Sequence, residues 1–265
     1  MEPIRLVVHG AAGRMGRRII ALAASDPTWK IQAALESSTH SELGKDAGLI
    51  AGWGPLGVSL TGELRADVSA DVAIDFSAPA ATVHFAEVCK RRAIPLVCAT
   101  TGLTPDQKKC LKEAAEVVPV LWAPNMSLAV NLAMKLVAEA ARILKNHHPD
   151  IEIVEWHHRF KEDAPSGTAL QFAQIIEEQL GKKQHRHGRE GRPGIRSRDE
   201  IGFHAIRAAD HPGEHVILFG LLGETLELNV RAISRDCYAQ GALAAARFLV
   251  GKPPGLYSMA QVLGL

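Results

Sequence analysis

The sequence has no excess of charge of either sign, no cysteine pair of the metal-binding type and no long uninterrupted apolar run. Its 265 residues include 30 lysines and arginines against 29 acidic residues, which gives a formal net charge of +1. General nucleic-acid binders and polybasic membrane binders depend on a global positive excess, so we expect neither kind of partner. Apolar residues make up 47% of the chain, which is enough for a sizeable core and too much for intrinsic disorder.

The four cysteines show no zinc-binding pattern. They stand at positions 89, 98, 110 and 237, with no C-x-x-C pair among them. We interpret them as reduced, mostly buried thiols, and we predict no metal site.

No segment has the pattern of a membrane span or of a secretory signal. The longest uncharged run, residues 117–134, contains Pro119, Pro124 and two asparagines, which divide it into a strand, a turn and the start of a helix. The residues from Met1 to Arg5 belong to no long apolar signal region. We therefore expect a cytoplasmic protein that binds no membrane.

Short apolar segments alternate with helical patterns over roughly the first half of the chain. We predict strands at residues 4–9, 30–36, 71–76, 95–99 and 117–122, with helices after most of them. Alternation of this kind predicts an α/β domain with a doubly wound parallel sheet. The glycine-rich segment 41–66 gives no clear assignment.

The pattern changes after residue 127. A long apolar helix fits residues 128–144, and a strand and a helix follow at 151–155 and 168–180. Three strands then succeed one another without a helix, at about 201–207, 215–220 and 225–233, before a last helix at 238–250. We predict two domains: an α/β domain of residues 1–127 plus 240–265, and an α+β domain of residues 128–239 with a mixed sheet.

A glycine loop joins the first predicted strand to the first helix, with the sequence Gly10-Ala11-Ala12-Gly13-Arg14-Met15-Gly16. Glycines let a pyrophosphate approach the backbone, and the helix N-terminus supplies N–H groups and a positive dipole end. Glu36 follows the second strand, 20 residues beyond Gly16, where an acid can bind the ribose hydroxyls of a dinucleotide. This context predicts a Rossmann-like dinucleotide site; the alternative is an ordinary turn followed by a surface glutamate.

Two further turns follow strands of the same predicted sheet. Ala99-Thr100-Thr101-Gly102 comes after the fourth strand, and Ala123-Pro124-Asn125-Met126-Ser127 comes after the fifth. Both turns offer polar groups for a nicotinamide or its ribose at the carboxyl edge of the sheet. Turn chemistry alone also explains these residue types, and both interpretations stay open.

The densest group of reactive side chains lies between a strand and a helix of the second domain. His157, His158, Arg159 and Lys161 place four potential proton donors within five residues. Clustered cations lower one another's pKa, so a lysine here can act as an acid near neutrality. Ser166-Gly167-Thr168 then opens a helix, whose N-terminus suits a carboxylate.

Simpler interpretations exist for the same segment. Ser166-Gly167-Thr168 can be only a helix cap, and a histidine pair is more often structural than metal-binding. A second basic segment, residues 182–198, is interpreted either as a solvated loop or as a surface that steers an anionic ligand.

In their order along the chain, these motifs closely resemble bacterial 4-hydroxy-tetrahydrodipicolinate reductase, also called dihydrodipicolinate reductase. The most specific stretch is Glu155-x-His157-His158-x-x-Lys161-x-Asp163-x-Pro165-Ser166-Gly167-Thr168. Further matches are Ile201-Gly202-Phe203, Arg207, Gly213-Glu214-His215, Arg235 and Gly241-Ala242. The resemblance covers nearly the whole chain, whereas the glycine loop by itself is common to many families.

The resemblance implies a nicotinamide-dependent reductase of lysine and diaminopimelate biosynthesis. It implies a homotetramer and a small dicarboxylate substrate. It also implies catalysis by His157 and Lys161, with Lys161 as the proton donor. The substrate-binding residues that it implies are His158, Ser166, Gly167 and Thr168. The cofactor residues that it implies are Gly10, Ala11, Ala12, Gly13, Arg14, Met15, Glu36, Ala99, Thr100, Thr101, Ala123, Pro124, Asn125 and Met126.

Two positions depart from the family pattern. Many relatives place an arginine directly after the ribose-binding acid, whereas this chain has Ser37, which favours NADH over NADPH without excluding the latter. Asn229 stands where several relatives have histidine. A related reductase such as an aspartate dehydrogenase, and a nicotinamide-binding redox sensor, are the alternative functions.

Overall fold

The computed structural model describes residues 2–265, which form two compact units. The first unit contains the residues up to Leu128 together with Arg235–Leu265, and the second contains Ala129–Ser234. Each unit has its own hydrophobic core and is described by itself.

The first unit is built on a parallel sheet of seven strands in the order β12-β6-β5-β4-β1-β2-β3. The predicted doubly wound α/β fold is confirmed. The strands are β1 (Ile4–His9), β2 (Trp29–Leu35), β3 (Leu60–Thr61), β4 (Val72–Asp75), β5 (Leu96–Cys98), β6 (Pro119–Trp122) and β12 (Gly255–Tyr257).

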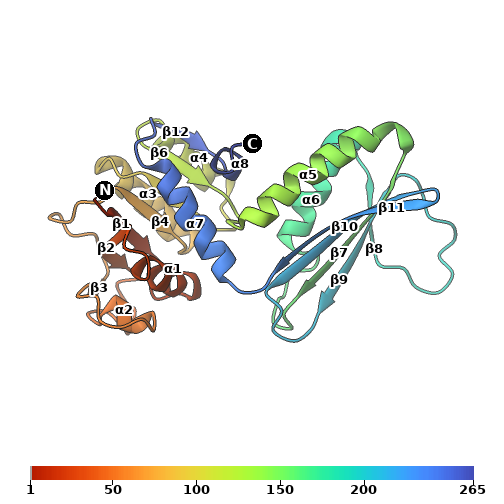
Figure 1. Cartoon of the computed structure of the whole chain (residues 1–265). Coiled ribbons are helices and arrows are strands. Elements are labelled where there is room, and N and C mark those ends of the chain that lie inside the picture. The colour runs from red at the N-terminus through yellow and green to blue at the C-terminus, as the bar shows by residue number, and fades with distance from the viewer. Residues whose placement is uncertain (1) are drawn as a thin grey trace. The chain divides into compact units, whose positions relative to one another are not determined.

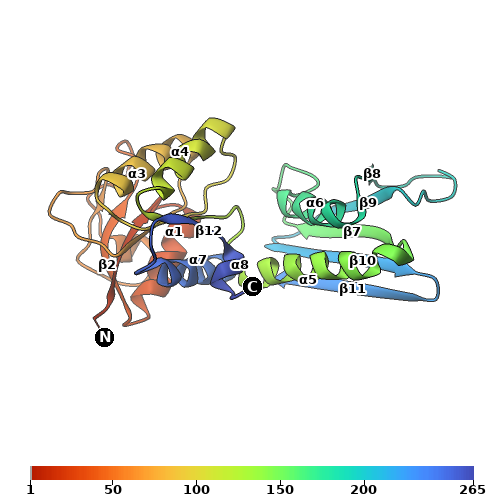
Figure 2. The same cartoon turned by 90° about the horizontal axis from the view of Figure 1, so that it is seen from above.

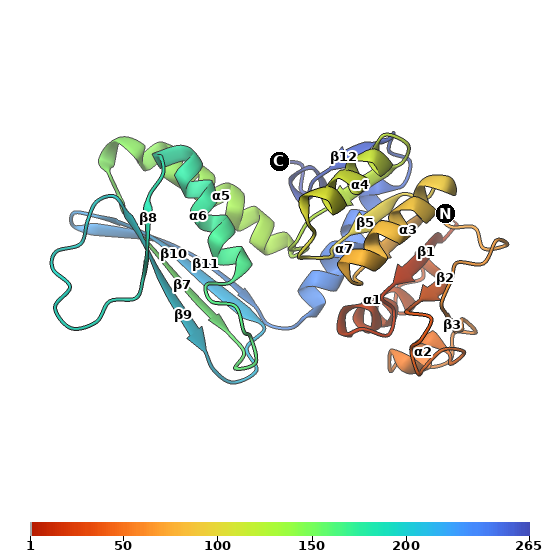
Figure 3. The same ribbon diagram turned by 180° about the vertical axis from the view of Figure 1, so that it is seen from behind.

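Helices cover both faces of this sheet because successive side chains of a strand point to opposite sides. Leu6 and Val8 of β1 pack in the cluster that contains residues of α1 and α7, whereas Val7 packs with residues of α3 and α4. Figure 1 shows α1 and α7 on the near side of the sheet, and Figure 3 shows α3 and α4 from behind. The helices are α1 (Arg14–Ala24), α2 (Ala47–Ile50), α3 (Pro79–Arg91), α4 (Pro105–Ala115), α7 (Asp236–Leu249) and α8 (Met259–Val262).

The second unit has a five-stranded mixed sheet in the order β11-β10-β7-β9-β8. β9 runs parallel to β7 and β8, and β10 runs antiparallel to β7 and β11. The strands are β7 (Asp150–His157), β8 (Gln184–His187), β9 (Glu200–Arg207), β10 (Gly213–Leu221) and β11 (Glu224–Ala232). The edge strand β8 lies within the basic segment that the sequence analysis assigned to a loop.

Both long helices of the second unit, α5 (Leu128–Leu144) and α6 (Gly167–Leu180), lie on the same face of its sheet. Figure 2, seen from above, shows them over the strands, and their apolar side chains join those of β7, β9 and β10 in one buried cluster. A short 3-10 helix (Lys145–His147) follows α5. Because strand residues alternate in direction, β7 presents Glu155 and His157 to the helix side and Val154 and Trp156 to the other side.

Within residues 2–265, no helix is both long and apolar enough to cross a membrane. In the same range, no group of three or more histidine, cysteine or acidic side chains is arranged to hold a metal ion.

Candidate active site

The glycine loop of the first unit needs glycine at two points for steric reasons. Gly10 has φ +75°, and a Cβ on it would lie 2.6 Å from the carbonyl oxygen of Phe76. A Cβ on Gly16 would lie 2.1 Å from the carbonyl oxygen of Gly10. Side chains at these positions would therefore push α1 and β4 away from the loop, and their absence leaves a backbone cradle at the start of α1.

Glu36 stands beside this cradle, directly after β2. Its carboxylate accepts hydrogen bonds from the backbone N–H groups of Ala12 and Ser37, each at 3.0 Å. Glu36 and the glycine loop line a cavity of about 670 Å³, together with residues that follow β3 and β4. The volume lies in the range of small-molecule sites, so these residues fit the adenosine half of a dinucleotide.

A buried carboxylate, that of Asp75, ties together the carboxyl ends of β1, β4 and β5. It accepts from His9 Nδ1 (2.9 Å), the backbone N–H of Ser77 (3.0 Å) and the hydroxyl of Thr82 (2.5 Å). Burial opposes ionisation, but the hydrogen bonds and charge of His9 and the other donors hold the pKa of Asp75 below its usual value. The hydroxyl of Thr100 lies 2.7 Å from that of Thr82 and belongs to the same network.

The two other predicted cofactor turns lie at this same edge of the sheet, because β4, β5 and β6 are parallel neighbours. The N–H of Ala99 donates to the carbonyl of Asp75 (2.9 Å), and the N–H of Ala123 donates to the carbonyl of Cys98 (3.1 Å). Thr101 is exposed and Met126 is buried. The structure thus brings the glycine loop, Glu36 and both turns to one edge, although the Thr100 hydroxyl is directed into the protein.

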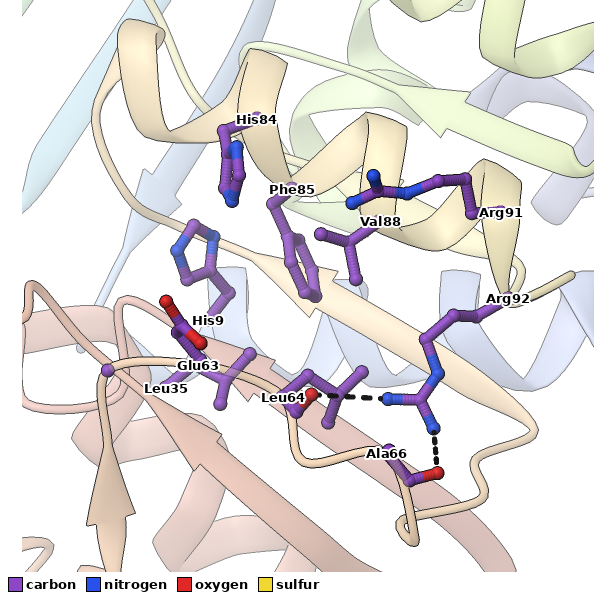
Figure 4. Close-up of a pocket in the computed structure, with 11 residues that line it drawn as sticks. His9, Leu35, Glu63, Leu64, Ala66, His84, Phe85, Val88, Arg91 and Arg92 are labelled. Carbon is purple, nitrogen blue, oxygen red and sulfur yellow. Dashed lines mark hydrogen bonds between the residues drawn. The ribbon is translucent and has the colours of Figure 1, made fainter.

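A second cavity, of about 460 Å³, adjoins the first and shares His9, Gly62, Glu63 and His84 with it. Figure 4 shows the side chains of His9, Glu63 and His84 at one end and those of Arg91 and Arg92 at the other. The guanidinium of Arg92 donates to the carbonyls of Leu64, Arg65 and Ala66 and so anchors the loop that forms one wall. The crevice therefore continues from the glycine loop along α3.

The second unit contains a second buried carboxylate, that of Glu155 in β7, which is only 1% exposed. Its two oxygens accept from the guanidinium of Arg207 (2.9 and 2.6 Å), from the backbone N–H of Ser166 (3.1 Å) and from Nδ1 of His157. Burial acts to raise the pKa of Glu155, but the hydrogen bonds from His157 and Arg207 outweigh it and lower the pKa to about 2. Glu155 is therefore an anion whose hydrogen-bond partners are all donors.

Lys161 lies in the irregular loop between β7 and α6. Its Nζ donates to the carboxylate of Asp163 at 2.7 Å, and its side chain is 21% exposed. The carbonyl of Asp163 in turn accepts from the guanidinium of Arg207 at 2.7 Å. The lysine is thus connected to Glu155 through Asp163 and Arg207.

Ser166 caps α6 as the sequence predicts: its hydroxyl accepts from the N–H of Ala169 at 3.2 Å. The same hydroxyl lies 3.0 Å from Nε2 of the buried His215, whose ring packs edge-on against His157 at 5.2 Å. Burial, reinforced by the charge of His157, lowers the pKa of His215 to about 4. A neutral His215 accepts a hydrogen bond from the Ser166 hydroxyl, so this hydroxyl is held inside the protein.

Gly167 and Thr168 form the first turn of the 14-residue helix α6, where the backbone N–H groups and the positive end of the helix dipole suit an anion. His158 follows β7 directly, and the ring of the exposed Phe160 lies 6.3 Å from its own. The predicted residues His157, Lys161 and Ser166–Thr168 are therefore brought together around Glu155 and Arg207.

Sequence analysis assigned no role to Glu155, Arg207 or His215, nor to Asp75 in the first unit. A signal was present in the strands: Glu155 stands at a core position of β7, in phase with Ile151 and Ile153. A charged residue at a buried strand position needs partners, but the sequence does not say which residues supply them.

The basic segment 182–198 is largely neutralised where it meets the sheet. Arg189 pairs with Glu152 (2.8 Å) and Glu200 (2.6 Å), and Arg196 pairs with Asp150 (2.7 Å) and Glu152 (3.0 Å). These ion pairs fasten the loop to β7 and β9, which accounts for two of its arginines without an anionic ligand.

Comparisons with known proteins give a consistent result over the whole chain. Residues 4–126 match the family model described as dihydrodipicolinate reductase, N-terminus, and residues 129–263 match the model for the C-terminus. The chain is 52% identical to a 4-hydroxy-tetrahydrodipicolinate reductase of Rhodopirellula baltica, over 99% of this chain and 97% of the relative. It is 43% identical to that of Geobacter sulfurreducens, over 98% and 99%.

Two solved structures share the fold. Dipicolinate-bound dihydrodipicolinate reductase from Paenisporosarcina sp. TG-14 matches with a TM-score of 0.78 at 25% identity and covers 98% of both chains. An amine dehydrogenase from Mycobacterium smegmatis matches with a TM-score of 0.66 at 13% identity, over 97% of this chain and 95% of the other. The second likeness concerns the fold alone.

The lowered pKa of His215 predicts a loss of stability in acid. The unfolded chain takes up a proton near pH 6.5 and the folded chain only near pH 4, so the free energy of unfolding falls as the pH falls through that window. Between pH 7 and pH 5 we expect a loss of about 2 kcal/mol from this residue. Urea unfolding of the wild type and of His215→Gln at both pH values measures the difference, which the variant should largely abolish. His147→Gln, which removes an exposed histidine, is the control and should lose as much stability as the wild type. An equal loss in the wild type and in His215→Gln would contradict the prediction.

Proposed function

Because the chain belongs to the dihydrodipicolinate reductase family, we propose that its Glu155-centred cluster binds and protonates the ring substrate while the crevice at Gly10 holds the nicotinamide cofactor. The family's reaction is an NAD(P)H-dependent reduction in the diaminopimelate route to lysine, catalysed by 4-hydroxy-tetrahydrodipicolinate reductase. The observation that carries the proposal is the joining of His157, the Lys161 loop and the N-terminus of α6 through one buried carboxylate.

In this proposal the cofactor binds to the first unit, which corresponds to the predicted domain of residues 1–127 plus 240–265. Its backbone cradle and the carboxylate of Glu36 support this assignment. A bound nicotinamide supplies a hydride. The residues proposed to hold the cofactor are Gly10, Ala11, Ala12, Gly13, Arg14, Met15, Glu36, Ala99, Thr100, Thr101, Ala123, Pro124, Asn125 and Met126.

The substrate is proposed to bind to the predicted domain of residues 128–239. A ring dicarboxylate needs positive potential, which the N-terminal turn of α6 and the nearby Lys161 offer. The Paenisporosarcina relative carries dipicolinate, a ring with two carboxylates, and this supports a substrate of that class here. In this proposal His158, Gly167 and Thr168 contact the carboxylates of the substrate. Ser166 belongs to the same site as the residue that caps the helix.

Lys161 is the proposed proton donor, with His157 beside it. As the substrate is reduced, negative charge builds toward its ring nitrogen, where a cationic acid both stabilises the charge and delivers the proton. Asp163 holds the Nζ of Lys161 by a 2.7 Å ion pair. This contact fixes the direction in which the ammonium group presents its other protons.

Replacing Lys161 by methionine tests the donor role. We expect kcat to fall by about a hundredfold or more, because general acids typically contribute 10²–10⁴-fold, while the dissociation constant of NADH stays within twofold. The assay follows nicotinamide oxidation while a synthase forms the unstable substrate from pyruvate and aspartate semialdehyde. Lys112→Met, on the exposed side of α4, is the matched control and should behave as wild type. Near-normal turnover of Lys161→Met would remove Lys161 from this role.

NADH is the proposed preferred cofactor. The carboxylate of Glu36 is fixed by Ala12 and Ser37 N–H groups, so a negative charge stands where the additional phosphate of NADPH would lie. Ser37 is exposed and offers only a hydroxyl to that phosphate. Repulsion without a compensating arginine favours the cofactor that carries a free 2′-hydroxyl.

Introducing the missing charge should shift the preference. Ser37→Arg is expected to raise kcat/KM with NADPH relative to NADH by about tenfold, since one charge-assisted hydrogen bond is worth that much. Ser37→Gln, which adds length without charge, should leave the ratio near that of the wild type. A wild type that already prefers NADPH, or two variants with equal ratios, would overturn this assignment.

A homotetramer is the proposed assembly. The sheet face of the second unit that is opposite to α5 and α6 carries apolar side chains on three adjacent strands, and Trp156 and Ile206 are 37% and 43% exposed. Strand register places Val154 beside Val216 and Trp156 beside Ile206 on this face. Exposed apolar side chains grouped on one face of a sheet are typical of an interface, and closed symmetry would cover them.

Sedimentation equilibrium checks the assembly. The wild type should have four times the mass of one chain, and Leu218→Glu should lower it, because the new carboxylate would stand between Glu152 and Glu227 on that face. Leu49→Glu, at an equally apolar exposed position in α2, should leave the mass unchanged. A monomeric wild type would refute the proposal.

A further inference from the structure

Two charged side chains at the proposed substrate site, Glu155 and Arg207, contact neither substrate nor cofactor in the function proposed above. Glu155 is 1% exposed, and the side chain of Arg207 is 18% exposed. Their contacts leave no obvious room for substrate, because the carboxylate is surrounded by protein donors. We propose that Glu155 and Arg207 are positioning residues that hold His157, the Lys161 loop and the start of α6 in the arrangement the reaction needs.

This inference rests on the proposed function. It concerns how the substrate residues are held and not which reaction they perform.

Glu155 and Arg207 stand on two adjacent strands of the sheet, β7 and β9. Glu155 and His157 are two residues apart on β7, so both side chains point to the helix-covered face. The parallel register of β7 and β9 places Arg207 beside His157. Two neighbouring strands therefore carry the pair, whereas Lys161, Asp163 and Ser166 come from the irregular segment between β7 and α6.

Glu155 determines which nitrogen of His157 carries a hydrogen. An ionised carboxylate only accepts hydrogen bonds, so Nδ1 of His157 donates to it and Nε2 is left for the substrate side. The ring is held in that orientation by the same bond. This is the role of an orienting carboxylate, separate from any contact with the reacting atoms.

Arg207 extends this control to the loop. One terminal nitrogen of its guanidinium donates both to Glu155 (2.6 Å) and to the carbonyl of Asp163 (2.7 Å). The carboxylate of Asp163 holds the Nζ of Lys161 (2.7 Å). A continuous series of contacts therefore runs from the buried anion to the proposed proton donor, and the planar fork of arginine is needed to make it.

The anion site at α6 depends on the same carboxylate. Glu155 accepts the backbone N–H of Ser166, the residue that caps the helix. The position of the first helical turn relative to His157 is thereby set by two bonds to one carboxyl group.

Glutamine at position 155 is the most informative change. Every neighbour of the Glu155 carboxyl group is a donor, so the amide NH₂ of a glutamine would face another donor at one of its two positions. The substitution keeps the size of the side chain, replaces one of its two acceptor oxygens by a donor and removes the charge. Misplacement of reacting groups by about 1 Å can lower a rate by about a hundredfold.

The experiment compares Glu155→Gln, Arg207→Lys and Glu177→Gln by kcat, KM and the pH profile of kcat in the synthase-coupled assay, together with the dissociation constant of NADH. Glu177 is the matched control, because it also lies in the second unit and accepts from a histidine, His185 Nε2 at 3.2 Å. We expect Glu155→Gln to lower kcat by about a hundredfold and to displace the pH profile, with NADH binding unchanged. Arg207→Lys should lower kcat by about tenfold, because an ammonium group cannot keep the contacts to both Glu155 and Asp163 in the same geometry.

Three outcomes separate the possibilities. If the wild type is inactive with synthase present, the proposed function fails. If the wild type is active and Lys161→Met is not, but Glu155→Gln and Arg207→Lys keep the wild-type kcat and pH profile, the positioning role alone is refuted. If Glu155→Gln fails to fold, Arg207→Lys decides: a lower kcat with a displaced pH profile supports the role, and unchanged values refute it.

Discussion

The proposed substrate site depends on the burial of one negative charge, the carboxylate of Glu155. An ion that is removed from water is stable only if its lone pairs are filled by well-placed donors. Here those donors are His157, Arg207 and the backbone of Ser166, and each belongs to a different part of the site. The contacts that stabilise the buried charge therefore also hold these parts of the site together.

The first unit follows the same principle with Asp75. Its buried carboxylate stands at the end of a strand whose other residues, Val72 to Ile74, are apolar. Donors from β1, from α3 and from the turn after β4 converge on it, and the Thr100 hydroxyl closes the network. Both units thus use an acidic residue at the carboxyl end of a buried strand to fix the loops that would meet ligands.

The sequence predicted the elements that have strong periodicity or a specific signal. The parallel sheet followed from the alternation of strands and helices, and the position of Glu36 followed from its distance to the glycine loop. The strands β3 and β12 were missed because two or three residues show no period. β8 was missed because its residues are mostly polar and basic, which is typical of a loop.

The site was predicted only where its chemistry is local in the chain. His157, Lys161 and Ser166–Thr168 stand within twelve residues of one another and could be grouped by inspection. The partner of Glu155 is Arg207, 52 residues away, and His215 reaches Ser166 across 49 residues. The first pairing arises from the register of β7 and β9, and the second from the packing of the start of α6 against β10. Neither can be found from local patterns in one sequence.

Hydrogen–deuterium exchange with dipicolinate tests whether the loop and the helix start around Glu155 form a dicarboxylate site. We expect slower exchange of the amides of Gly167 and Thr168 when dipicolinate is added, because a carboxylate bound at the first turn of α6 would accept hydrogen bonds from them. The same experiment with NADH alone should slow exchange in the glycine loop instead. Protection by dipicolinate confined to the first unit, or none in residues 157–169 at a saturating concentration, would contradict the account.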